Sequence, residues 1–119
     1  MTLVYEEKGM LPQAVEADLF DMKEPSATTM RSAYRRGGWT AYQRARISVL
    51  SPQNEGCFAY EIGLSYLRIG DPDRAVPSLD RAIDEGCFWT LWLKTNPVLD
   101  DFRSDPRYSD LLRRAKLPD

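Results

Sequence analysis

The fold is decided by residues 63–82, GLSYLRIGDPDRAVPSLDRA, which predict two helices joined by a tight turn. Tyr66 lies near the end of the first helix. The Gly-Asp-Pro run at 70–72 supplies the turn, because its aspartate can cap the second helix and its proline suits the first helical turn. Gly63 and Ala75 are small and allow a close approach of the two helices. The stretch therefore predicts an antiparallel helical hairpin.

The same spacing of a tyrosine and a glycine occurs three times along the chain. The tyrosines are Tyr5, Tyr34 and Tyr66, each with a glycine four residues later, and they lie 29 and 32 residues apart. Helical-hairpin repeats have this period. The first copy is shortened by the start of the chain and carries Asp18 at an expected core position, and the second has Gln43 in place of an alanine. The short first helix favours a longer parent protein.

The third copy resembles the tetratricopeptide repeat. Its Gly63, Tyr66, Gly70, Ala75 and Ala82 match that family's pattern of small and aromatic residues. The segments 33–39 and 92–114 are similar to the carboxyl-terminal repeats of bacterial multidomain regulators, which carry kinase, cyclase or winged-helix domains. The resemblance implies an all-α fold in which antiparallel hairpins stack into a superhelix, a tetratricopeptide-like solenoid.

On this reading residues 1–119 form a single domain. We expect hairpins at about 1–22, 26–50 and 56–85, followed by terminal helices over about 88–116, of which the last caps the solenoid. Within the second hairpin, Gly37 and Gly38 form the turn.

Composition places the chain among ordinary globular proteins. Hydrophobic residues make up 43% of the sequence, and the net charge is −2. This balance gives no general attraction to nucleic acid or membrane. No apolar run reaches the roughly 18 to 20 residues that a membrane span needs, and the amino terminus lacks the basic-then-apolar pattern of a signal sequence. We therefore expect a cytoplasmic protein.

The two cysteines, Cys57 and Cys87, occupy identical Gly-Cys-Phe triplets 30 residues apart. That spacing suggests equivalent places in successive hairpins. Such places lie on the order of 8 to 10 Å apart in stacked helices, which is too far for a disulfide. The sequence thus predicts two small apolar residues without a redox or metal role, since there is no histidine to complete a metal site.

Stacked hairpins line a concave face with their first helices, on which an extended peptide or partner helix binds. Carrying the repeat geometry onto this chain gives the candidate contact residues Arg35, Arg36, Tyr60, Leu64, Leu67 and Arg68. The arginines favour an acidic peptide or a terminal carboxylate, because guanidinium pairs with carboxylate through two hydrogen bonds. The alternative is that they are solvated surface charges. We expect a non-catalytic scaffold for protein–protein interaction that needs no cofactor.

Three other functions are weighed against this one. Catalysis is disfavoured, because histidine and the phosphate-loop and nucleophile motifs are absent from the sequence. Nucleic-acid binding through the basic segment 31–46 is disfavoured, because its aromatic residues occupy packing positions and the pI is about 5.2. Self-association is the main alternative. It would use the apolar first hairpin, with Leu3, Val4, Leu19 and Phe20, and would make a homodimer.

Overall fold

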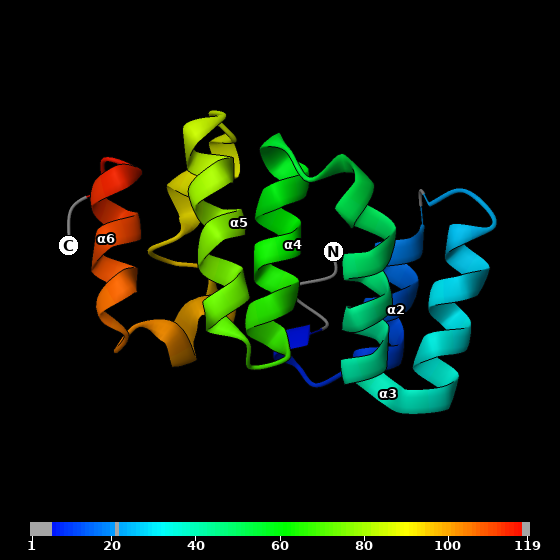
Figure 1. Ribbon diagram of the computed structural model, residues 1–119. Helices are drawn as coiled ribbons and strands as arrows, with labels where there is room; N and C mark the ends of the chain where they lie inside the picture. The colour runs from blue at the N-terminus through cyan, green and yellow to red at the C-terminus, as the bar shows by residue number, and fades with distance from the viewer. Residues whose placement is uncertain (1–5, 21, 118–119) are drawn as a thin grey trace. The chain divides into compact units, whose positions relative to one another are not determined.

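A computed structural model describes residues 6–20 and 22–117, and within them the chain is helical and contains no strand (Figure 1). The all-α prediction is confirmed. The chain divides into two compact units, Met1–Ala45 and Arg46–Asp119. Tyr5, Leu3 and Val4 lie outside the described residues. No helix in the described part of the chain is long and apolar enough to cross a membrane.

The first unit is built from α2, Leu11–Leu19, and from the greater part of α3, Ser26–Leu50. The predicted turn at Gly37 and Gly38 is confirmed, because Gly38 has φ 73° and ψ −155° and interrupts the helical conformation of α3. Only glycine adopts such a conformation without strain.

Two side-chain contacts hold α2 to α3 in this unit. Arg31 donates to both carboxylate oxygens of Glu16 at 3.0 Å. The hydroxyl of Tyr42 donates to the carboxylate of Asp18. Asp18, which the repeat pattern led us to expect in the core, is partly exposed and uses its carboxylate to hold a buried tyrosine instead.

The second unit contains the predicted hairpin. A short 3-10 helix η1, Ser51–Gln53, precedes α4, Gly56–Arg68, and α5, Pro72–Asp84, packs beside α4 (Figure 1). The turn between the two helices needs Gly70 at φ 75°. Asp71 caps α5 as predicted, accepting a hydrogen bond from the backbone N–H of Arg74 at 3.2 Å.

The carboxyl-terminal third differs from the expected run of helices. Residues 88–102 form two 3-10 helices, η2, Phe88–Trp92, and η3, Pro97–Phe102, and only α6, Pro106–Arg114, is an α-helix. Capping side chains begin both η3 and α6: Asn96 accepts from the N–H of Val98, and Asp105 accepts from the N–H of Arg107. The 3-10 helices η2 and η3 wind more tightly than an α-helix, as is usual for short helical segments.

The cysteines are bonded to each other, so the prediction of two free thiols is wrong. The Cα atoms of Cys57 and Cys87 lie 5.1 Å apart and their sulfur atoms form a disulfide. Cys57 is the second residue of α4, and Cys87 follows the end of α5. Because these helices are antiparallel, the start of one meets the end of the other. The two triplets are the two ends of one hairpin and not equivalent places in successive hairpins.

Candidate functional site

The six residues predicted to contact a partner are divided between the two units. Arg35 and Arg36 are exposed on α3 in the first unit, whereas the other four lie on α4 in the second. Tyr60 and Leu64 are each 3% exposed and belong to the core of the second unit. The prediction that Tyr60 and Leu64 lie on an open face is therefore wrong. Leu67 and Arg68 are partly exposed, and their role as partner contacts, like that of Arg35 and Arg36, stays a prediction.

Tyr60 and Leu64 are buried because η2 and η3 pack on the face of α4 that was expected to be open. The side-chain amide of Asn96 donates to the hydroxyl of Tyr60 at 2.9 Å. Burial raises the pKa of Tyr60, and the Asn96 hydrogen bond opposes that shift. Leu93, Leu99 and Phe102 complete the same apolar cluster.

The basic segment 31–46 has its aromatic residues packed on one another. The ring of Trp39 stacks on Tyr42 at 5.6 Å, and Tyr34 meets Tyr42 edge to face at 6.3 Å. Arg46 is 9% exposed and donates to the Ser65 hydroxyl at 3.1 Å. These contacts give the residues structural roles.

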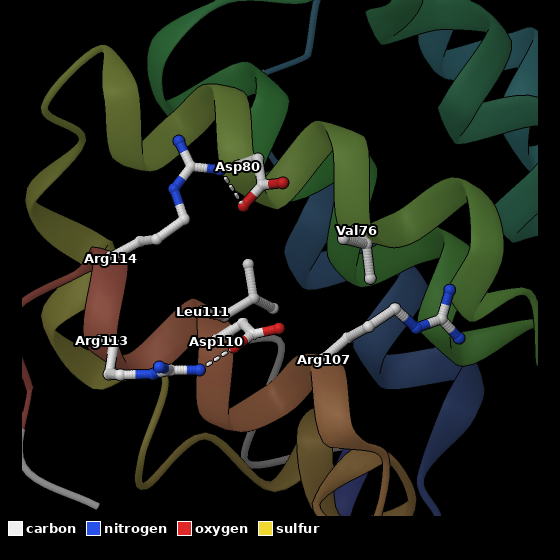
Figure 2. A pocket seen from close by; sticks show the side chains of 7 residues that line it. All are labelled: Val76, Asp80, Arg107, Asp110, Leu111, Arg113 and Arg114. Carbon is white, nitrogen blue, oxygen red and sulfur yellow. Dashed lines mark hydrogen bonds and ion pairs between the residues drawn. The ribbon is translucent and has the colours of Figure 1, made fainter.

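A groove of about 510 Å³ lies between α5 and α6 (Figure 2). Its floor is apolar, made by Val76 and Leu111, and three arginines of α6 surround it. The sequence did not predict this groove. Its lining residues are Val76, Asp80, Arg107, Asp110, Leu111, Arg113 and Arg114.

The arginines of the groove are engaged by aspartates. Arg107 donates to Asp73 at 2.9 Å, and Arg114 pairs with Asp80 at 2.6 Å and with Asp84. Figure 2 shows the pairs of Arg114 with Asp80 and of Arg113 with Asp110. Carboxylates of the protein thus already neutralise the guanidinium groups. The groove is therefore lined by side chains that are ion-paired with one another.

The ion pair between Arg107 and Asp105 predicts a testable dependence of folding stability on pH. The Arg107 side chain and, next, its backbone N–H hold the pKa of Asp105 below its usual 3.8. A carboxyl group whose pKa is lowered by folding stabilises the folded state above its unfolded pKa, and this contribution is lost as the pH falls through the folded value. We expect Asp105→Asn, which keeps a capping side chain, to reduce the acid dependence of stability below about pH 4. Carboxyl NMR titration and urea unfolding of both proteins measure it. An Asp105 pKa at or above 3.8 would contradict the prediction.

The second unit also carries an apolar surface that nothing in its described residues covers. Four side chains of one five-residue segment are about half exposed: Phe88 57%, Trp89 46%, Leu91 56% and Trp92 47%. We call these four residues the aromatic surface. Solvent-facing positions of this size and apolarity are uncommon unless they contact a partner.

The 3-10 conformation of η2 explains which side chains face outward. With three residues per turn, every third residue points the same way. Cys87, Thr90 and Leu93 are 5%, 7% and 0% exposed and form the inner ridge. The two remaining ridges, 88 with 91 and 89 with 92, face outward and are entirely apolar.

The neighbouring helix η3 provides an internal comparison. It too has a buried inner ridge, made by Leu99 and Phe102 at 0% and 4% exposure. Its outward positions include Asp100 and Asp101, both exposed. A 3-10 helix packed on this core therefore does not require apolar outward residues. The example of η3 thus gives no structural reason for the outward positions of η2 to be apolar.

The aromatic surface is held in place by its own contacts and by the disulfide. The rings of Phe88 and Trp89 lie 4.8 Å apart, and those of Trp89 and Trp92 lie 5.4 Å apart. The Thr90 hydroxyl donates to the Cys87 carbonyl at 2.7 Å, and Cys87, the residue just before η2, is bonded to α4 through the disulfide. The surface is thus preorganised, which reduces the entropy lost when a partner binds.

The comparisons with known proteins give no relative to set beside these surfaces: no family model, no curated protein and no solved structure matches the chain. Among residues 6–20 and 22–117, no group of acidic or cysteine side chains is arranged to hold a metal ion. The sequence signal for the aromatic surface was the run FWTLW at 88–92, whose apolar residues exceed what one buried ridge needs.

Proposed function

We propose that this chain is a non-catalytic protein–protein interaction module that binds a protein or peptide through the aromatic surface. The observation that carries the proposal is the pair of outward apolar ridges on η2, which the neighbouring η3 lacks because it has exposed aspartates at outward positions. Trp is among the residues that contribute most to binding energy in protein interfaces. The partner's contact region is therefore expected to be apolar.

Within this proposal the helical hairpins are repeats of the tetratricopeptide type. The ion pair between Arg107 and Asp73 joins residues 34 positions apart, and Arg114 and Asp80 have the same separation. Thirty-four residues is the tetratricopeptide period. These pairs support α6 as the counterpart of α5 in a following repeat. The disulfide favours an oxidising compartment over the cytoplasm that the sequence suggested.

The proposal is tested with the full chain as bait for a phage-displayed library of random linear peptides. Selected peptides are then synthesised and titrated by calorimetry against the wild type and Trp92→Ala. Because truncation of a central tryptophan removes a binding hot spot, we expect affinity to fall roughly thirtyfold or more. Trp92 is half exposed, so its truncation should leave the core intact.

Phe20→Ala is the matched control, since Phe20 is 85% exposed and lies in the first unit. It should bind the selected peptides as the wild type does. Reversing the charges of Arg35, Arg36 and Arg68 tests the groove predicted from the sequence. If that variant loses binding while Trp92→Ala keeps it, the aromatic surface is not the binding site.

A further inference from the structure

We propose that two copies of this chain pair through the aromatic surface, about a two-fold axis that brings Glu85 of each copy to Lys94 of the other. The inference rests on the proposed function and names the partner of the same surface. It differs from the self-association considered from the sequence, which used the first hairpin.

The first argument is the distribution of charge along the segment. Residues 86–93, GCFWTLWL, contain no charged side chain, and they are bounded by Glu85 at one end and Lys94 at the other. Both end residues are exposed. When a two-fold axis passes through the middle of a segment, the two copies of that segment run in opposite directions, so the start of one lies against the end of the other. Two such segments lying antiparallel therefore place acid against base at both ends and apolar rings against apolar rings between them.

The local contacts leave Glu85 able to take this role. Its carboxylate accepts from Arg81 at 3.1 Å and from the backbone N–H of Gly56 at 2.5 Å. A carboxylate has about four acceptor positions, so two bonds do not saturate it. The Glu85 side chain is 37% exposed, and these two bonds fix its position beside the disulfide.

The second argument is the size of the surface. With roughly half of each side chain exposed, the aromatic surface offers about 400 Å². Phe58, 46% exposed, is a further apolar side chain near it, because Phe58 follows Cys57 and its Cα lies within about 13 Å of that of Phe88 through the disulfide. A stable interface buries about 800 Å² on each partner. The pairing is therefore expected to be weak and concentration-dependent.

The experiment is sedimentation velocity of the full chain without reductant, from low micromolar to several hundred micromolar protein. We expect the wild type to shift from monomer to dimer over that range. Leu91→Asp gives η2 the kind of outward residue that η3 already carries, and it should raise the dissociation constant at least roughly thirtyfold. Phe20→Asp should leave the equilibrium unchanged. Circular dichroism and thiol titration confirm that each variant is folded and oxidised.

The two-fold arrangement has its own readout. Equal amounts of unlabelled and nitrogen-15-labelled chain are mixed, treated with a zero-length carbodiimide and digested. We expect a mixed-isotope crosslink between the peptides containing Glu85 and Lys94, which can arise only between two copies. Its absence from a dimeric sample overturns the arrangement.

Two outcomes overturn the pairing itself: a wild type that stays monomeric at every concentration, or a dimer that survives Leu91→Asp. If a monomeric chain still binds selected peptides through Trp92, the proposed function stands and only this inference fails. If the chain dimerises as described but selects no peptide, the inference stands and binding of linear peptides through the aromatic surface is refuted.

Discussion

Removing the Cys57–Cys87 disulfide is expected to lower the free energy of unfolding of the second unit by about 3.5 kcal/mol. The two cysteines are 30 residues apart in sequence, so the bond closes a loop that includes both α4 and α5. Closing a loop of this length removes chain entropy from the unfolded state, and the expected stabilisation lies between the values of about 3 and 4.7 kcal/mol for loops of 15 and 100 residues. Urea unfolding of wild type and of Cys57→Ala/Cys87→Ala measures the difference.

Reductant provides the internal control for this prediction. It should destabilise the wild type by a similar amount and leave the double variant unchanged. Before reduction, the denatured wild type should titrate with no free thiol, because both cysteines are bonded. A wild type whose unfolding midpoint is the same with and without reductant would show that the disulfide does not constrain the hairpin.

The disulfide also shows why sequence reasoning succeeded at one end of the hairpin and failed at the other. Gly70, Asp71 and Pro72 act through contacts within a few residues, so their turn and cap were predictable from composition. The bond between Cys57 and Cys87 depends on which helix ends meet. Repetition of a triplet does not reveal that, because two ends of one hairpin and two successive hairpins give similar spacings.

The candidate site was missed for a related reason. Apolar content at 88–102 predicts helical segments but does not distinguish a period of three from one of 3.6 in such short runs. The period determines which side chains form the candidate site, because a 3-10 helix turns Phe88 and Trp92 outward and lets Leu93 reach α4. The same packing buries Tyr60 and Leu64, which the family resemblance had placed on an open face.

The second prediction with a large effect concerns the contact between Gly63 of α4 and Leu79 of α5, where the two helices of the hairpin approach each other. A Cβ atom at Gly63 would lie 2.7 Å from Cγ and 2.8 Å from Cδ2 of Leu79, which is closer than side chains pack. Gly63→Ala should therefore destabilise the second unit. Overpacking costs about 1 to 3 kcal/mol, and two contacts of 2.7 and 2.8 Å with a fully buried leucine favour the upper part of that range, above the gain of about 1 kcal/mol from replacing a helical glycine.

Leu79→Ala is expected to lower the free energy of unfolding by about 3 kcal/mol, because Leu79 is fully buried and its truncation leaves a cavity. Gly63→Ala should reverse its effect in that background. With the Leu79 side chain removed, the added methyl group occupies part of the cavity, and only the Ala75 carbonyl at 3.3 Å must move slightly. The double variant should then be more stable than Leu79→Ala alone.

A double-mutant cycle measured by urea unfolding tests this reversal, since the coupling energy isolates the contact between the two positions. Additive effects would mean that Gly63 is small for a reason other than its contact with Leu79. A coupled cycle would establish that a single glycine sets how closely α4 and α5 approach. That approach also fixes where the end of α5 lies against the start of α4, and so where the disulfide and the aromatic surface beyond it are placed.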